Sequence, residues 1–394
     1  MERKEFIKKS TAFGLSIPFI PMVLESCYKK LNSGIDSDFS GKVLIIGAGA
    51  AGLSAGFLLQ KSGIDFEIIE ASSLYGGRVR RHPGFADFPI DIGAEWIHTS
   101  PKVLSEIAND PKANETIETI EYNPNVYYLI DGALYPDSSS YSENKFKNTT
   151  WYGFFENYIV PDILQNIRFK KQVTEINYKT DKVAVKTNTG ETFTGDKVLV
   201  TVPIKILQEG SIQFMPQLPN DKIRAINNIT MVDGIKVFME FKNRFYHDMI
   251  IVGRESEVFT KGYKIFYDAA FKKDSTRNIL GLFAVDSRAA PYINLSEQEI
   301  IDTVLTELDD IFEGQASLNY TKHLIQNWSK EPFIKGAYSL HFNGFRGAIM
   351  RKVAEPLNNK IFFAGEALSK NNQAQVHGAC ETAFKAIEVM LKRS

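Results

Sequence analysis

The stretch that decides the fold spans residues 42–56 and reads KVLIIGAGAAGLSAG. Its first five residues form an apolar, β-branched run that stops at a glycine, which is typical of a buried parallel strand. A helical pattern follows over residues 53–61, and a second apolar run at 66–69 ends in Glu70. A strand, a glycine turn, a helix and a second strand that ends in an acid predict a dinucleotide-binding unit.

Each residue of this turn has its own expected role. Gly47 allows the tight turn, Gly49 lets backbone N–H groups approach a diphosphate, and Gly52 brings the helix close to the strand. Ala51 lies in the first helical turn, whose free N–H groups and positive dipole end attract phosphates. Glu70 follows Gly52 by 18 residues, and we expect its carboxylate to accept hydrogen bonds from the adenosine ribose.

The composition sets outer limits on the function. The chain has 394 residues, 44% hydrophobic and 24% charged, which fits a globular protein of two or three domains and excludes disorder or coiled coil as its main structure. A formal net charge of −1 does not indicate the excess of basic residues that is typical of nucleic-acid-binding proteins. Two cysteines and six scattered histidines predict neither a disulfide framework nor a metal site.

Residues 1–27 have the features of an export signal. A basic start precedes an apolar stretch, residues 12–24, which is too short to span a bilayer but suits a signal peptide. The stretch ends in a sequence that resembles a bacterial lipobox, whose Cys27 would carry a lipid anchor. We therefore expect an exported, membrane-anchored lipoprotein or a periplasmic protein, with residues 28–40 as a linker. The alternative is a cytoplasmic protein with a frayed tail.

Further motifs follow in order along the chain. They are GGR at 76–78, DIGAEWIH at 91–98, TVP at 201–203, GIKV at 234–237, NW at 327–328, GAYS at 336–339, FFAGE at 362–366 and VHGA at 376–379. Together these motifs resemble the flavin-containing amine oxidase family, which includes monoamine oxidases, polyamine oxidases and flavin-dependent histone demethylases. The resemblance runs from about residue 42 to the C-terminus.

The resemblance implies an α/β fold with two interleaved domains. A discontinuous, Rossmann-like FAD-binding domain takes residues 41–98, 165–208 and 345–394. A smaller substrate-binding domain, with a mixed sheet and α+β character, takes residues 99–164 and 209–344. Beyond the glycine turn and Glu70, the resemblance assigns FAD contacts to Gly77, Arg78, Gly93, Ala94, Glu95, Trp96, Val173, Trp328, Gly365, Glu366 and Val376.

Lys236 is the first candidate for catalysis. In the run GIKVFMEF, residues 234–241, apolar residues alternate with Lys236, Phe238 and Glu240, which a strand would send to opposite faces. Matched to the family's active-site lysine, Lys236 is implied to face the flavin and to hold a water that helps hydride transfer or reoxidation by oxygen. The alternative is a solvent-exposed lysine on an amphipathic strand.

Three further residues match positions around the substrate amine. Tyr338 matches an aromatic residue that flanks the amine in the family and is also assigned to catalysis. Gln375 stands where many relatives carry a second aromatic wall. His98, in a Trp-Ile-His run like that of animal polyamine oxidases, is implied to accept a hydrogen bond from a distal ammonium group. A core tyrosine and a structural histidine are the alternatives.

The implied cofactor is non-covalent FAD, because Ala337 stands where monoamine oxidases carry a flavin-linked cysteine. The implied reaction is oxidation of a small-molecule amine by hydride transfer to flavin, hydrolysis of the imine, and reoxidation by O2 with release of H2O2. Two alternatives stay open. One is a related flavin dehydrogenase for an amino acid or an isoprenoid- or porphyrin-like substrate. The other is a non-catalytic FAD-binding or lipid-carrier module.

One segment departs from the family pattern. Relatives usually place a helical subdomain between the hairpin signal at residues 131–135 and Trp151. Here residues 136–150 are rich in Ser and Asn and have no apolar period, so the sequence indicates a loop. Loss of a helical lid would leave the flavin more open to water.

Overall fold

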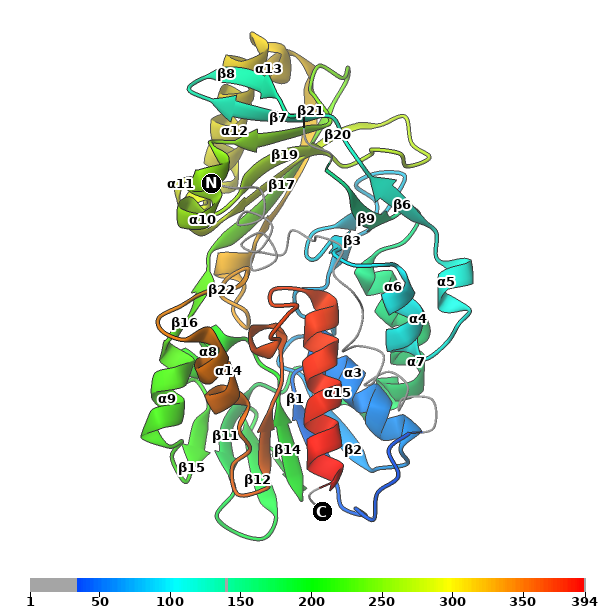
Figure 1. Ribbon diagram of the computed structural model, residues 1–394, viewed down its shortest axis with the longest axis vertical. Coiled ribbons are helices and arrows are strands. Elements are labelled where there is room, and N and C mark those ends of the chain that lie inside the picture. The colour runs from blue at the N-terminus through cyan, green and yellow to red at the C-terminus, as the bar shows by residue number, and fades with distance from the viewer. Residues whose placement is uncertain (1–33, 139–140, 393–394) are drawn as a thin grey trace.

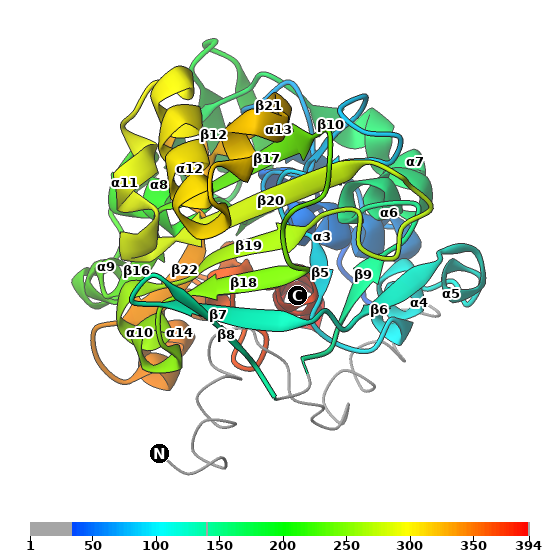
Figure 2. The same ribbon diagram turned by 90° about the horizontal axis from the view of Figure 1, so that it is seen from above.

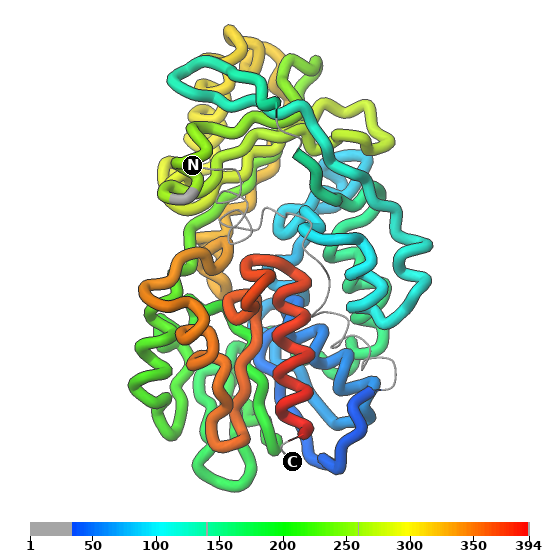
Figure 3. Tube along the Cα trace, viewed as in Figure 1, coloured from blue at the N-terminus to red at the C-terminus, as the bar shows by residue number. Residues whose placement is uncertain are grey.

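The computed structural model describes residues 34–138 and 141–392 of the protein (Figure 1). Its two parts lie at opposite ends of the long axis, one built on a parallel sheet and the other on a mixed sheet (Figures 1 and 3). The expected signal peptide with Cys27 lies outside the described residues. Within the described ranges, no helix is both long enough and apolar enough to cross a membrane.

A five-stranded parallel sheet, in the order β10-β2-β1-β14-β23, carries the glycine turn. β1 and β14 are buried along their whole length, because helices α3 and α15 cover one face and a second sheet covers the other. The strands come from separate parts of the chain, which confirms the discontinuous Rossmann-like fold. The elements are β1 (Val43–Ile46), α3 (Ala50–Lys61), β2 (Phe66–Ile69), β10 (Ile167–Arg168), β14 (Lys197–Val200), β23 (Ile361–Phe363) and α15 (Val376–Lys392).

The second sheet, in the order β13-β12-β11-β15, packs on the parallel sheet together with three helices and a two-stranded β16-β22 sheet. It closes the face of the parallel sheet that α3 and α15 leave free. Its elements are β11 (Val173–Asn177), β12 (Val183–Thr187), β13 (Thr192–Gly195), α8 (Ile204–Gln208), β15 (Gln213–Met215), α9 (Asn220–Asn227), β16 (Ile229–Val232), β22 (Tyr338–Phe342), α14 (Arg346–Ala354) and the short η6 (Glu366–Leu368).

A seven-stranded mixed sheet, in the order β21-β17-β20-β19-β18-β7-β8, forms the other part, and its β18-β7 pair is parallel. Figure 2 shows the strands side by side with α12 across one face. The expected mixed sheet is therefore confirmed. Its elements are β7 (Val126–Ile130), β8 (Ala133–Pro136), β17 (Gly234–Phe241), β18 (Met249–Val252), α10 (Glu255–Lys261), β19 (Lys264–Asp268), β20 (Asn278–Val285), η4 (Asp286–Arg288), α11 (Ala290–Ile293), α12 (Glu297–Phe312), α13 (Gln315–Asn319), β21 (Tyr320–Asn327) and η5 (Trp328–Lys330).

The segment 136–150, for which the sequence indicated a loop, contains a strand. β9 (Glu143–Phe146) pairs antiparallel with β5 (Trp96–Ile97) and with β6 (Thr119–Tyr122). The prediction was wrong because β9 has no alternating apolar pattern: it reads ENKF, and its burial comes from its two partner strands. A short β3-β4 hairpin, β3 (Arg81–His82) and β4 (Ile90–Asp91), precedes β5.

Residues 99–164, which we assigned to the substrate-binding domain, divide between the two parts. β7 and β8 join the mixed sheet, whereas the helices of this range share a core with α3 and α15. Aromatic side chains such as Trp151 and Phe154 fill that shared core. The helices are α4 (Lys102–Ala108), α5 (Ala113–Thr116), α6 (Trp151–Tyr158), α7 (Val160–Ile163) and the short η3 (Leu164–Asn166).

Candidate active site

A cavity of about 360 Å³ runs from the glycine turn to the mixed sheet. Its size falls within the range of small-molecule sites, about 300–1,000 Å³. Of the residues that the sequence assigns to the site, Gly52 alone does not line it. The lining residues are Gly47, Gly49, Ala51, Glu70, Gly77, Arg78, Gly93, Ala94, Glu95, Trp96, His98, Val173, Lys236, Trp328, Tyr338, Gly365, Glu366, Gln375 and Val376. The structure thus brings them together, and their individual roles stay predictions.

The three glycines of the turn differ in what surrounds them. Gly47 has φ +104°, which side-chain-bearing residues rarely adopt. A Cβ on Gly52 would lie 1.9 Å from the carbonyl oxygen of Gly47, so packing of α3 on β1 requires this glycine. A Cβ on Gly49 would meet its nearest atom only at 3.9 Å and would point into free space. Protein packing therefore does not require a glycine at Gly49, but the close approach of a cavity ligand would.

The carboxylate of Glu70 is held by the backbone on both sides. Its Oε2 accepts the N–H of Ala48 at 2.6 Å, and its Oε1 accepts the N–H of Ser72 at 2.7 Å. Burial raises the pKa of Glu70, while these two hydrogen bonds act in the opposite direction. The side chain therefore has a fixed place in the wall of the cavity at the end of β2, where a ribose contact is expected.

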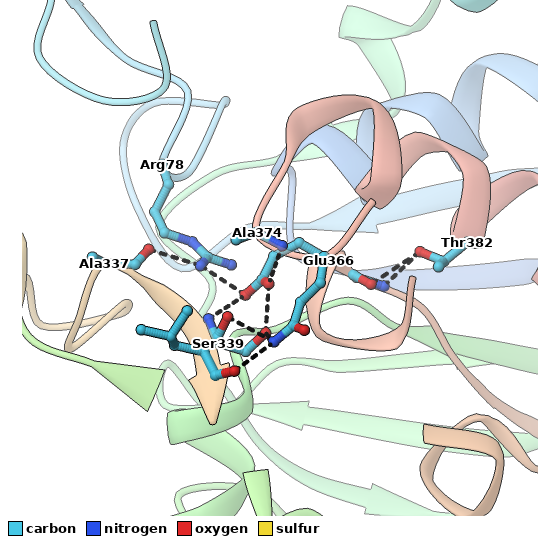
Figure 4. Close-up of polar contacts among 9 residues, drawn as sticks. Arg78, Ala337, Ser339, Glu366, Ala374 and Thr382 are labelled. Atoms are coloured by element: carbon cyan, nitrogen blue, oxygen red, sulfur yellow. Dashed lines mark hydrogen bonds and ion pairs between the residues drawn. The ribbon is translucent and has the colours of Figure 1, made fainter. Parts of the chain in front are cut away.

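The carboxylate of Glu366 links Arg78 of the GGR motif to Ser339 on β22 and to Ala374 (Figure 4). Its Oε1 accepts hydrogen bonds from Arg78 Nη1 at 2.9 Å and from the N–H of Ser339 at 3.1 Å. Its Oε2 accepts from the Ser339 hydroxyl at 2.7 Å and from the N–H of Ala374 at 3.1 Å. Arg78 also donates to the carbonyl oxygen of Ala337 at 2.9 Å. The guanidinium of Arg78, which the resemblance assigns to FAD, is thus engaged in an ion pair that the sequence did not predict.

The alternation predicted for the strand around Lys236 is confirmed. The side chains on one face of β17 pack in the core beneath α12. On the other face, Lys236 and Phe238 lie on the cavity side of the sheet. The residues of the first face are Ile235, Val237, Met239 and Phe241. Lys236 is 2% exposed, so it is not the solvent-exposed lysine of the alternative interpretation.

Lys236 takes part in a buried cluster of charged groups. Its Nζ donates to Glu95 Oε2 at 2.7 Å and to the carbonyl oxygen of Asp91 at 3.0 Å. The Tyr267 hydroxyl donates to the same Oε2 at 2.5 Å, and Lys145 Nζ forms an ion pair with Glu95 Oε1 at 2.5 Å. Two ammonium groups and one phenol therefore converge on a single carboxylate.

The two acids of this cluster have opposite pKa shifts. Burial alone would raise the pKa of Glu95, but the charges of Lys145 and Lys236 lower it to about 2. Burial and the nearby charge of Glu95 raise the pKa of Asp91 well above its ordinary value. Glu95, which we predicted as an FAD contact, is thus the counter-ion of two lysines.

The sequence did not identify Lys145 or Tyr267 as parts of the site. Lys145 lies on β9, in the segment that resembles a loop in sequence, and Tyr267 lies on β19 among other apolar residues. Neither position belongs to a motif that the resemblance covers. Only the pairing of β9 with β5 places Lys145 next to the GAEW segment.

The predicted substrate residues lie in the cavity wall between the two parts. Tyr338 is the first residue of β22, and burial raises its pKa. The buried Gln375 carries an Oε1 without a hydrogen-bond partner among the described residues, so it is a free acceptor beside the cavity. His98 Nδ1 lies 3.3 Å from Glu143 Oε1, and Trp328 Nε1 donates to the carbonyl oxygen of Ile92 at 2.9 Å.

The geometry of the cavity fits FAD. No side chain caps the N-terminus of α3, so the N–H groups of its first turn are available to a diphosphate. Gly49 leaves the space above this turn free, and the Glu70 carboxylate lies at the end of β2. At the far end, Lys236 and Trp328 line the same cavity, where the flavin ring would lie.

Comparisons with known proteins agree with this geometry. The chain matches the flavin containing amine oxidoreductase family over residues 50–151 and 157–391. It is 30% identical over 220 residues to human lysine-specific histone demethylase 2, which is 54% of this chain and 26% of the demethylase. It is 22% identical to polyamine oxidase 2 of Arabidopsis thaliana, over 89% of this chain and 88% of that protein.

A solved structure of a putrescine oxidase variant has the same fold, with a TM-score of 0.74 at 15% identity, over 90% of this chain and 100% of that chain. The chain spans about a quarter of the length of the first curated relatives it matches. The family match itself covers most of the chain and includes α3, β17 and nearly all of α15. The chain belongs to the flavin-containing amine oxidoreductase family, and its cofactor is FAD.

Proposed function

We propose that this protein is an FAD-dependent oxidase of a small-molecule amine. The observation that carries the proposal is that one cavity joins the dinucleotide turn to a buried lysine, Lys236, and an aromatic wall, Tyr338. A dinucleotide carrier without catalysis has no need of a buried lysine that lines the ligand cavity, since burying a charge costs free energy. The relatives named as a polyamine oxidase and a putrescine oxidase act on amines, which supports the same reaction class.

The residues of the chain have separate tasks in this reaction. Bound FAD supplies the acceptor for the hydride that leaves the carbon next to the amine nitrogen. Tyr338 presents an aromatic face that orients the amine. Lys236 uses two N–H groups on Glu95 and on the carbonyl oxygen of Asp91, which leaves its third N–H for a water or ligand in the cavity.

The overall reaction balances with oxygen as the electron acceptor. The amine loses a hydride and a proton and becomes an imine, and water then converts the imine to a carbonyl compound and a free amine or ammonia. O2 takes up the two electrons and two protons and leaves as H2O2. The buried walls of the cavity limit access of bulk water to the reacting carbon.

An anaerobic reduction experiment tests the proposed function. The purified flavoprotein is mixed without oxygen with mono-, di- and polyamines and, in a separate arm, with amino acids, while the visible flavin band is recorded. At least one amine should bleach the band, and admission of O2 should restore it with one H2O2 per turn. Bleaching by amino acids alone would support a related dehydrogenase, and no bleaching by any compound would contradict catalysis.

We further propose that FAD is bound without a covalent link. Ala337 lines the cavity at the position where a cysteine would be needed for a thioether, and the buried Cys380 lies within α15. Denaturation with acid should therefore release all yellow colour into the supernatant. Colour that stays with the precipitated protein would contradict the proposal.

We also propose that residues 1–27 direct export and that Cys27 carries a lipid anchor. The support is the sequence alone: a basic start, a short apolar stretch and the lipobox-like end. In a bacterial host, the full chain should fractionate with membranes, and Cys27→Ala should abolish the acyl mass found on the mature N-terminus. An uncleaved chain in the cytoplasm would contradict this proposal.

A further inference from the structure

Lys145 is the second cation of the buried cluster, and it reaches the active site from the segment that departs from the family pattern. β9 places its Cα opposite that of Trp96 on β5 and opposite that of Ile120 on β6. The side chain is 2% exposed. A lysine is rarely buried to this degree without a specific partner, because its charge must leave water.

Three aromatic rings and one carboxylate contact the Lys145 ammonium, and each of these stabilises a cation. Its Nζ lies 4.6 Å from the ring centroid of Tyr122 and 5.0 Å from those of Trp96 and Tyr267. These distances are typical of cation–π contacts. The fourth contact is the ion pair with Glu95 at 2.5 Å. The site is therefore built around a positive charge, with three aromatic faces and one carboxylate.

The cluster places two lysine side chains on one carboxylate. Lys145 and Lys236 share the single carboxylate of Glu95. Asp91 contacts Lys236 through its backbone carbonyl oxygen, and burial together with the charge of Glu95 raises the pKa of its carboxyl group. Nearby Lys273 is a third lysine, and burial lowers its pKa to about 8. One lysine would satisfy Glu95, so ion pairing alone does not explain the second.

The other groups around the cluster have partners of their own or are neutral phenols. Asp268 on β19 forms its own ion pair with Arg244 at 2.8 Å. Tyr122 and Tyr267 are phenols whose pKa burial raises, so they stay neutral. The carboxylate of Glu95 is therefore the shared partner of both lysines, and the cluster lines the cavity through Glu95 and Lys236.

We propose that Lys145 is a positioning residue that fixes Glu95 and adds a positive charge beside the flavin end of the cavity. This inference rests on the proposed function. A flavin becomes more negative when it accepts a hydride, and a fixed positive charge in a buried site favours the more negative form. The charge of Lys145 should thus raise the reduction potential of bound FAD without a direct contact.

The test is a set of variants with graded charge, measured by the midpoint potential of the bound flavin in a spectroelectrochemical titration. K145M removes the second ammonium and fills the aromatic enclosure with an apolar chain of similar length, so the potential should become more negative. E95Q removes the carboxylate and should shift the potential in the positive direction. The double variant restores the native net charge and should return close to the wild-type potential.

Lys222 provides a matched control. It is 1% exposed, its Nζ donates to the carbonyl oxygens of Lys352, Val353 and Glu355 at 2.7–2.9 Å, and it lies 4.6 Å from the ring centroid of Phe363. It does not line the cavity. K222M should therefore change stability but leave the flavin potential at the wild-type value.

The outcomes separate this inference from the proposed function. A wild-type protein that no amine reduces contradicts the function, whereas its flavin potential can still be compared with that of K145M. A native potential in K145M, or shifts of the same sign in K145M and E95Q, overturns the role of Lys145. If K145M alone does not fold, the double variant decides, because a potential equal to that of E95Q overturns the role of Lys145. If both variants lose flavin while K222M keeps it, the cluster is structural and the inference is overturned.

Discussion

The two ends of the cavity are built in different ways. At the nucleotide end, the glycine turn and Glu70 lie within residues 47–70, and their geometry is set by two strands and the helix between them. At the substrate end, Glu95, Lys145, Lys236 and Tyr267 come from four separate places in the chain. The first end is thus defined by local backbone shape, and the second by the placement of charges through tertiary contacts.

The largest expected effect is on FAD binding at the nucleotide end of the cavity. Gly49→Ala should fold with near-native thermal stability, because Gly49 has φ −76° and the new Cβ would meet no atom closer than 3.9 Å. It should nevertheless lose FAD almost completely, because the methyl group would take the space that the diphosphate needs. The measurement is flavin content per protein after saturation with FAD, together with the melting temperature.

Gly52→Ala is the comparison variant for this experiment. Its Cβ would lie 1.9 Å from the Gly47 carbonyl oxygen, so it should lower the melting temperature as well as flavin content. If Gly49→Ala binds FAD as tightly as the wild type, the diphosphate does not lie over this turn, and the comparison between the two ends fails.

The next effect is on the rate of flavin reduction and concerns the substrate end of the cavity. Lys236→Met should retain FAD, since the nucleotide end is unchanged, but should slow anaerobic flavin reduction by an amine about 10²-fold, the usual cost of removing one well-placed donor. Glu95 keeps Lys145 and Tyr267 as partners, so the fold should survive. Lys322→Met, on the neighbouring β21 and partly exposed, is the control. Reduction of K236M at the wild-type rate would falsify the assignment.

The contrast between the ends explains what the sequence could predict. The strand-turn-helix-strand order follows from apolar runs and glycines that are close in sequence, and the structure has the same order. The alternation around Lys236 was also readable, because period 2 is a property of one strand. The family resemblance supplied the cavity wall near the C-terminus, where spacing alone carried no information.

The charged cluster could not be predicted for a physical reason. β9 is polar in sequence and is a strand only because β5 and β6 offer hydrogen bonds on both sides. Its Lys145 reads as a solvent-exposed residue until that pairing buries it. The Arg78–Glu366 ion pair is likewise a contact between residues 288 positions apart, which no local pattern specifies. Ion pairs between residues that are distant in sequence therefore could not be predicted from the sequence.

A smaller effect is the dependence of stability on pH. The pKa of Glu95 is about 2 in the folded protein, below its ordinary value of 4.5, so the unfolded chain binds a proton in this range that the folded chain does not. Stability from this group is complete above about pH 4.5 and is lost as the pH falls toward 2, with a total of about 3 kcal/mol.

Urea unfolding at pH 5 and pH 3 measures this contribution. The wild type should lose about 2 kcal/mol more than Glu95→Gln between the two pH values, because the variant has no carboxyl group to titrate at this site. Groups that do not interact with Glu95 titrate in both proteins and cancel in the difference. Equal losses in the two proteins would show that Glu95 is not held by its lysines in solution.

The smallest expected effect separates the ring of Tyr338 from its hydroxyl group. The hydroxyl makes no hydrogen bond to any described residue, and the ring lines the cavity. Tyr338→Phe should therefore change kcat/KM for an amine by less than about threefold, whereas Tyr338→Leu, which removes the aromatic face, should lower it about fivefold, equal to about 1 kcal/mol. If Phe and Leu reduce kcat/KM equally, the hydroxyl and not the ring acts on the amine, and Tyr338 belongs with the polar groups of the substrate end. If only Leu has an effect, the aromatic ring acts on the amine. The wall of the substrate end then combines an aromatic face, Tyr338, with a buried cation, Lys236.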